Sequence, residues 1–446
     1  MIKGWKRSIC ILLLGIMVMS LSGCWDKREL SELAIVMGIA LDAGSGENGE
    51  TLTVSAQVAN PVSSGGSSGS GGAAEQTYNN FSGSGGSVFE ILRGITHKSS
   101  RRLYNSHNQV LLFGRELAEN QGLDEIIDFF LRDNEIRYNI LIAVTEGKAS
   151  ETLDVTPEYE NIPAREIEEL IRNQTANSES AVCTLLNFVQ CGLTPGKAAL
   201  VPIIRLVESS GSGDASSSES GGGDTSGGGG GSSGGDTSGG SGGSSGSSSE
   251  SGGGENQSKR LEISGSAVFD GGKMMGTLSK EETRGALWVR GGANAGIVSV
   301  EIDDIRVEIE VMDSEQSMSV DIGDDGVVKA EVRCVITANV GEVNGKGISI
   351  NKDFIKKLSS VCSEKVKKEI QMAYDKSVDL QCDVFGFGEY LYRHHLKKWR
   401  MAEDNWPEKY RSLSLSIHVQ VDIEELGELT ADVPLNTSVK NGEGIS

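Results

Sequence analysis

The chain has few cysteines, prolines and aromatic residues for its 446 residues, and it is short of positive charge. Its seven cysteines include no Cys-x-x-Cys pair, so the sequence indicates neither a disulfide scaffold nor a zinc site. Lysine and arginine number 41 against 63 aspartates and glutamates, which gives a net charge of −22. Because an acidic surface repels phosphate backbones, we expect no nucleic-acid partner.

Sequence patterns for catalysis are also missing. The adjacent His394 and His395 face different directions on a helix or a strand, so they form no chelate by themselves. Gly341–Gly347 lacks the spacing of a P-loop, and no nucleophile elbow occurs outside the Gly/Ser-rich tracts. Glu281 and Glu282 could act as paired carboxylates, but a solvated turn is the better interpretation. The sequence therefore predicts no enzyme, no metal site and no cofactor.

The N-terminus carries the most specific signal in the chain. A basic start, Met1–Arg7, precedes the apolar stretch Ile9–Met19, which is about half as long as a membrane-spanning helix. Leu21–Cys24 follows, with small residues directly before the cysteine. This arrangement predicts a lipoprotein signal peptide over 1–23 and a covalent lipid anchor on the sulfur of Cys24. A secretory signal followed by a chance cysteine is the less favoured alternative. No later segment is apolar for long enough to span a bilayer.

Two Gly/Ser-rich tracts, 63–87 and 209–258, interrupt the rest of the chain. Both are expected to be disordered, because they cannot bury enough apolar surface to offset the entropy lost on ordering. The longer tract is interpreted as a linker between an N-terminal block, 25–208, and a C-terminal block, 259–446. The shorter tract is interpreted as an insert in the N-terminal block, which is expected to comprise two subdomains.

The N-terminal block alternates between strand and helix patterns. The apolar run Leu33–Leu41 and the alternating residues from Leu52 to Val58 predict a hairpin. Further segments have the length and periodicity of strands, at 109–113 and 140–144, or of helices, at 88–95, 123–131, 164–171 and 181–189. Such alternation predicts a mixed sheet covered by helices.

The C-terminal block has cleaner periodicity. Apolar residues alternate with polar ones over 305–311, 328–340 and 413–423, which indicates an antiparallel sheet with one dry face. Between the last two strands, Ile355, Leu358, Cys362, Val366 and Ile370 fall on one helical stripe. The predicted fold class is therefore α+β and multi-domain, with an N-terminal mixed sheet and a C-terminal antiparallel sheet wrapped around a long helix.

Several uncommon strings in both blocks resemble the Ger(x)C family of spore germination proteins. They are CWDKREL at 24–30, RLY at 102–104, FFLRD at 129–133 with Glu135, ETRG at 282–285 and DVFGFG at 383–388. The chain departs from the family pattern in its long Gly/Ser-rich tracts. It also has Leu396 where the family often has proline.

The resemblance implies a non-catalytic lipoprotein, the C subunit of a nutrient germinant receptor. Such a subunit assembles with membrane A and B subunits on the outer face of the cell or of the spore inner membrane. The alternative is a solute-binding lipoprotein of a transporter, which would need two similar lobes with a cleft between them. The different patterns of the two blocks disfavour that alternative.

The motif residues admit two interpretations, internal support of the fold or contact with a partner. The candidate contact residues are Trp25, Asp26, Arg28, Glu29, Arg132, Asp133, Glu282, Thr283, Arg284 and Gly285. For each of them alone, a role in supporting the fold is the more common outcome. The segment from Trp25 to Arg28 is the exception, because it adjoins Cys24 and would be held near any membrane partner.

Overall fold

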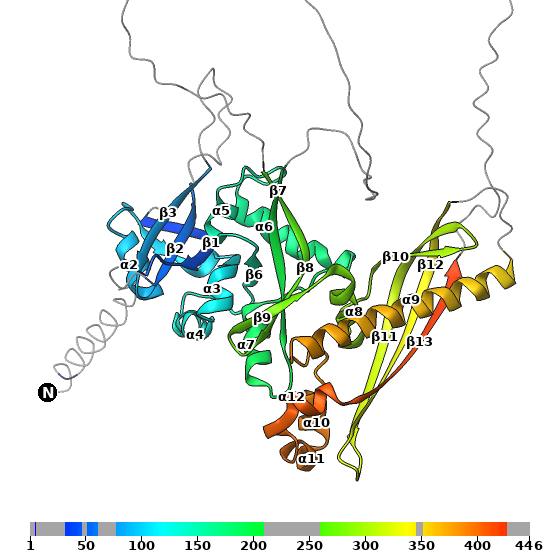
Figure 1. The fold of residues 1–446 in the computed structure, drawn as a ribbon. Coiled ribbons are helices and arrows are strands. Elements are labelled where there is room, and N and C mark those ends of the chain that lie inside the picture. The colour runs from blue at the N-terminus through cyan, green and yellow to red at the C-terminus, as the bar shows by residue number, and fades with distance from the viewer. Residues whose placement is uncertain are drawn as a thin grey trace, which may run out of the picture.

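A computed structural model describes Trp5 and residues 32–46, 51–60, 77–208, 259–344 and 351–425. Apart from Trp5, the predicted signal peptide lies outside these residues, and so do Cys24, Trp25, Asp26, Arg28, Glu29 and the tract 209–258. Helices and two sheets build the described chain (Figure 1), which confirms the predicted α+β class.

The first sheet has nine strands, in the order β3-β2-β1-β5-β6-β7-β8-β9, with β4 beside β1. Their bounds are β1 Leu33–Ala43, β2 Leu52–Ala59, β3 Tyr78–Gly85, β4 Arg102–Tyr104, β5 Val110–Gly114, β6 Leu141–Thr145, β7 Ala199–Glu208, β8 Lys259–Asp270 and β9 Lys273–Leu278. The central strands β1, β5, β6 and β7 run parallel, and antiparallel strands flank them on both sides. Every residue of β5 and β6 is buried, as expected of parallel strands covered on both faces. The predicted mixed sheet and the β1–β2 hairpin are confirmed.

Helices cover both faces of this sheet. Their bounds are α2 Val88–Ile95, α3 Arg115–Asn120, α4 Asp124–Arg132, α5 Ala149–Leu153, α6 Pro163–Asn173 and α7 Leu185–Leu193. Residues of α2, α3, α4 and α7 share one apolar core, and residues of α5 and α6 share another. The helix predicted over 181–189 begins only at Leu185, because the hydroxyl of Thr184 accepts the Asn187 N–H as an N-cap.

The prediction of disorder over 63–87 is wrong for its last part. Tyr78–Gly85 forms the edge strand β3, which pairs antiparallel with β2. Polar cross-strand pairs support it: Ser55 and Ser82 share a hydrogen bond of 2.7 Å, and the Gln57 amide donates to Asn80 at 3.0 Å. The amino-acid composition of this segment did not predict a strand, because the strand is stabilised by its pairing with β2.

The tract 209–258 joins two neighbouring strands of one sheet. Its flanks β7 and β8 pair antiparallel, with Glu208 directly opposite Lys259. Strands β8 and β9 therefore complete the first sheet, and the change from one sheet to the next falls after Leu278. The sequence placed a boundary between two blocks at 209–258, whereas this tract lies between two strands of the first sheet. A low-complexity tract indicates a loop, but it does not show which elements the loop connects.

The second sheet has four strands in chain order, β10 Gly296–Ile302, β11 Ile305–Ile322, β12 Val328–Asn344 and β13 Ser414–Glu425. The helix α9, Lys352–Asp379, lies across one face (Figure 1) and buries the predicted stripe from Leu358 to Ile370. The first three strands are antiparallel as predicted, but β13 runs parallel to β12. A parallel partner needs a crossover, and α9 with the helices after it provides one.

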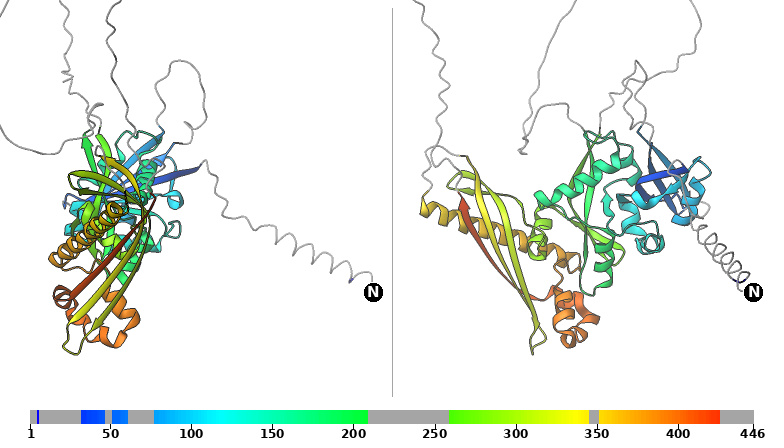
Figure 2. Two further views of the ribbon diagram at one scale, coloured as in Figure 1. Left: turned by 90° about the vertical axis from the view of Figure 1, so that its right-hand side faces the viewer. Right: turned by 180° about the vertical axis from the view of Figure 1, so that it is seen from behind.

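Short helices complete the second half of the chain and join it to the first. They are α8 Lys280–Arg290, α10 Phe387–His394, α11 Leu396–Arg400 and α12 Trp406–Arg411. The 3-10 turns of the described chain are Asn105–His107 and Gln174–Ala176 in the first half and Glu403–Asn405 in the second. One apolar core contains Leu200 and Val268 of the first sheet together with Trp288 of α8 and Ile370 of α9. The two sheets thus share a core, and Figure 2 shows α9 reaching from the second sheet towards the first.

Candidate functional site

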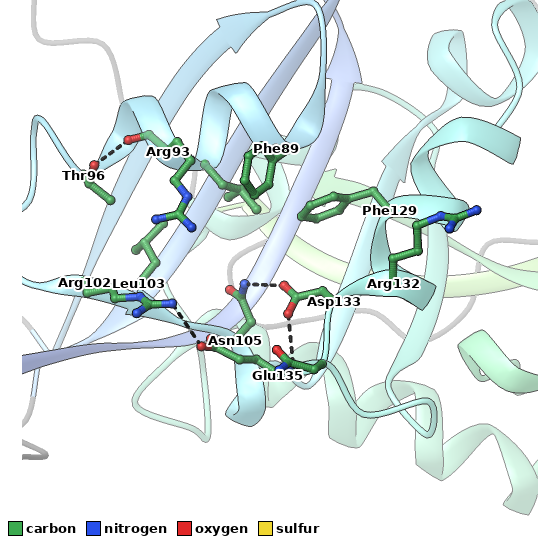
Figure 3. A pocket seen from close by; sticks show the side chains of 12 residues that line it. Phe89, Arg93, Thr96, Arg102, Leu103, Asn105, Phe129, Arg132, Asp133 and Glu135 are labelled. Atoms are coloured by element: carbon green, nitrogen blue, oxygen red, sulfur yellow. Dashed lines mark hydrogen bonds and ion pairs between the residues drawn. The ribbon is translucent and has the colours of Figure 1, made fainter. Parts of the chain in front are cut away.

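The motif residues Leu103, Asp133 and Glu135 line a cavity of about 340 Å³. We call it the motif cavity (Figure 3). Its wall comes from α2, from β4 with the 3-10 turn that follows, and from the end of α4. Two motifs that are about 30 residues apart in the sequence therefore meet at one place.

One wall of the motif cavity is aromatic. Helix α2 begins at Val88 after the N-cap Ser87, whose hydroxyl accepts the Glu90 N–H. With Ile91 buried on the inner side of the helix, Phe89 lies on the outer side and is 57% exposed. The Phe89 ring lies 6.2 Å from that of Phe129 on α4, and the Arg93 guanidinium lies 5.2 Å from the Phe89 centroid.

The opposite wall is polar and internally bonded. The buried Asn105 donates from Nδ2 to the Asp133 carboxylate at 3.3 Å, and the Glu135 N–H donates to the same carboxylate at 2.9 Å. Arg102 donates to Glu135 at 3.4 Å. Asp133 and Glu135 thus fasten the end of α4 to the turn after β4, which supports a fold-holding role for both.

Arg132 differs from its neighbours in the same motif. Its guanidinium donates to Asp128 one turn earlier at 2.7 Å, and its side chain is 77% exposed. The hydrogen bond from Arg132 lowers the pKa of the Asp128 carboxyl. Figure 3 shows Arg132 pointing away from Asp133. An exposed pair of this kind adds little to stability, so Arg132 is the described motif residue best placed to contact a partner.

The chemistry of the motif cavity suits binding. Phe89 and Phe129 lie on one side together with Arg93, and Arg102 and two carboxylates lie on the other. Among the described residues, the buried Oδ1 atom of Asn105 has no hydrogen-bond partner. The lining includes no cysteine, serine or histidine, and its carboxylates Asp133 and Glu135 accept hydrogen bonds from Asn105 and Arg102.

The ETRG motif, by contrast, is part of the core. Glu282 closes a capping box with Ser279 at the start of α8, so Glu281 and Glu282 lie in the first turn of a helix and not in the solvated turn that we expected. Thr283 is fully buried. A methyl group at Gly285 would clash with the backbone carbonyl of Glu369, so this glycine allows α8 and α9 to pack closely.

Arg284 forms a buried ion pair that the sequence did not predict. Its guanidinium donates to both carboxylate oxygens of Glu369 on α9, at 2.6 and 3.0 Å, and the Trp288 indole donates to the same carboxylate at 3.1 Å. The side chains of Arg284 and Glu369 are 9% and 1% exposed. Hydrogen bonding to Glu369 raises the pKa of Arg284 against the opposing effect of its own burial. A glutamate between the apolar Val366 and Ile370 was the available signal for this partner.

The FGFG string, 385–388, forms a backbone bend at the start of α10. Gly386 has φ +81°, and the buried Asp383 carboxylate accepts the N–H groups of Gly386, Phe387 and Gly388 and the indole N–H of Trp406. Burial raises the pKa of Asp383 to about 6 although these four donors favour its ionised form.

Other candidate features are placed as follows. The five described cysteines, Cys183, Cys191, Cys334, Cys362 and Cys382, are free thiols. The described residues contain no group of three or more metal-ligating side chains. Among these residues, no helix combines the length and apolarity that crossing a bilayer requires.

Two family models match the chain in succession. Residues 26–206 match the spore germination protein N-terminal domain, and residues 264–427 match the spore germination B3/GerAC-like C-terminal domain. The chain belongs to the Ger(x)C family. The models end and begin on either side of the tract 209–258, so this Ger(x)C protein carries the tract between the two family domains.

Relatives of this Ger(x)C protein in Bacillus subtilis (strain 168) match it over nearly their whole length. It is 24% identical to spore germination protein YndF, with 95% of this chain and 98% of the relative covered. It is 23% identical to spore germination protein KC, with 95% and 96% covered. The crystal structure of the GerBC protein matches with a TM-score of 0.48 and 14% identity, over 89% of this chain and 99% of that chain.

Proposed function

We propose that this Ger(x)C protein is the lipid-anchored subunit of a spore nutrient germinant receptor and acts by assembly with membrane A and B subunits. The observation that carries the proposal is the match of both family domains, in order, along the chain. The lipoprotein signal before Cys24 supports attachment to the outer face of the cell or of the spore inner membrane.

The contacts of the motif residues support a role in binding rather than catalysis. Asp133, Arg284 and Asp383 all bond to the protein's own backbone and side chains. Arg132 and Phe89 are among the exposed side chains at the motif cavity, and each lies on the outer side of its helix. We propose that these two, together with Trp25, Asp26, Arg28 and Glu29 beside the anchor, form the surface that meets a membrane subunit.

The anchor is tested by Cys24→Ala. This change removes the only sulfur at the predicted cleavage site, so both acylation and signal removal should stop. Metabolic labelling with a fatty acid should mark the wild-type chain and leave the variant unlabelled. Label that persists in the variant would refute the anchor at Cys24.

The contact surface is tested by charge reversal at two exposed arginines. Arg132→Glu should leave the melting temperature unchanged and abolish co-purification with the multi-spanning subunit encoded beside this gene. The matched control is Arg333→Glu on β12, since Arg333 is also exposed and paired with a neighbouring glutamate. The control should keep both properties. Loss of the complex in both variants, or in neither, would contradict the proposed surface.

The receptor role itself is tested in spores. Spores without this gene should fail to germinate with one class of nutrient and should still respond to external calcium dipicolinate. Normal germination with every nutrient, in a strain without a second copy of the receptor, would count against the proposal. A solute-binding lipoprotein would need two similar lobes, whereas the two sheets here differ in strand number, order and direction.

A further inference from the structure

A second, larger cavity lies between the two halves of the molecule. Its volume is about 610 Å³, and α7, α8 and α10 all contribute side chains to its wall. We call it the junction cavity. None of its lining residues belongs to the motif cavity. The three helices are labelled in Figure 1.

Positive charge predominates in the junction cavity. Its charged lining residues are the cations Lys197, Arg290 and Arg393 and the single carboxylate Glu389. This local excess of two positive charges contrasts with the net charge of −22 of the whole chain. An acidic protein that gathers cations around one cavity creates a local positive potential there.

Arg290 is the central cation of this group. It is half-buried, and its guanidinium donates to the backbone carbonyls of Ala198 and Val384, both at 3.2 Å, and contacts the sulfur of Cys191 at 3.8 Å. Among the described residues no carboxylate lies within ion-pair distance of it. The guanidinium is therefore fixed in position by neutral acceptors while its charge stays uncompensated.

The other two cations share one carboxylate. Lys197 and Arg393 both lie 2.6 Å from Glu389, on its two different oxygens. Glu389 can neutralise only one of the two charges. The amide side chains of Asn187 and Gln190 complete the polar part of the wall and supply further donors.

We propose that the junction cavity binds a small multivalent anion, a phosphate or a compound with several carboxylates. An excess of two positive charges in a partly enclosed cavity, one of them on the fixed guanidinium of Arg290, favours an anion with more than one charge over chloride or acetate. Helix α7 packs on the first sheet, whereas α8 and α10 lie in the second half of the chain. The bound anion would therefore bridge the two halves.

The test measures anion binding by the full-length chain purified in detergent. Equilibrium dialysis with radiolabelled citrate, and separately with radiolabelled phosphate, should show saturable binding to at least one of them. Excess unlabelled acetate should not compete. Arg290→Gln should weaken binding about tenfold or more, and Arg393→Gln should weaken it several-fold, because each removes a charge-assisted contact.

A control variant and a variant that should bind the anion more tightly complete the test. Arg333→Gln, outside the cavity, should bind as the wild type does. Glu389→Gln should bind the anion more tightly, since it removes the one negative charge of the wall, and a purely structural role of this cluster would not produce that gain. If Arg290→Gln is misfolded, Arg393→Gln decides the matter, because the Arg393 side chain is 64% exposed and can be replaced without disturbing the core. Absence of saturable binding in the wild type, or unchanged binding in Arg393→Gln, would overturn the proposal.

Discussion

The Glu369 carboxylate links α9 to the ETRG motif on α8, and its removal should be costly. Glu369→Gln keeps the shape of the side chain but leaves the Arg284 charge buried without a counter-charge. Loss of one partner from a buried pair costs about 3 to 5 kcal/mol, which urea unfolding should detect. In the exposed Glu331–Arg333 pair, Glu331→Gln should cost less than about 1 kcal/mol. Similar small losses in both variants would show that the buried pair does not hold the helices together.

Asp383 should make stability fall as pH rises through the acidic range. An aspartate in an unfolded chain has a pKa of about 3.9, whereas burial raises the pKa of Asp383 to about 6. Between these values the folded state binds more protons than the unfolded state, so the free energy of unfolding falls with rising pH and levels off above about pH 7. The shift of about two units corresponds to roughly 3 kcal/mol at most.

The Asp383 prediction is checked by two measurements. Carboxyl-labelled NMR should show one aspartate that titrates near pH 6 and is missing in Asp383→Asn. The free energy of unfolding of the wild type, relative to that of this variant, should fall between pH 4 and pH 7. An Asp383 carboxyl already ionised at pH 4 would show that its four N–H donors outweigh its burial.

At the scale of elements, the sequence predicted best where periodicity is strict. The alternation in β12 and β13 and the apolar stripe of α9 located these elements correctly, because one dry face imposes a regular pattern. Prediction from the sequence failed for Tyr78–Gly85, because this strand depends on cross-strand hydrogen bonds to Ser55 and Gln57. Strand direction was also missed for β13, since alternation is the same in parallel and antiparallel pairs.

The apolar stripe of α9 can be tested with two neighbouring substitutions. Leu358 is fully buried against the second sheet, so Leu358→Asp should destabilise the fold by roughly 4 kcal/mol or force the carboxyl to protonate. Lys356→Asp, on the exposed side of the same helix, should change stability little. Lys357 is a poorer control, because it pairs with Asp303 at 2.5 Å. Thermal unfolding should separate the two variants clearly, and equal losses would show that the helix buries a different face.

At the scale of the whole molecule, the candidate site was predictable only in part. The motif strings pointed to Asp133 and Arg284, but their partners Asn105 and Glu369 were not identified. Glu369 is 85 residues from Arg284, and contacts over such distances leave no periodic trace in the sequence. The cations of the junction cavity were missed for the same reason, since Lys197, Arg290 and Arg393 come from three separate segments.

The pairing of β7 with β8 predicts what happens when the chain is cut in the tract 209–258. A linker between independent blocks would release two fragments, whereas here the cut would fall between neighbouring strands that are paired from Ala199–Phe269 to Glu208–Lys259. The core shared by the two sheets also holds residues from both sides of the cut, such as Leu200 and Trp288. A protein with an engineered protease site in the tract should therefore run as one species in gel filtration after complete cleavage, and should separate only in denaturant. Separation of the fragments under native conditions would show that the β7–β8 ladder and this core do not hold the halves together.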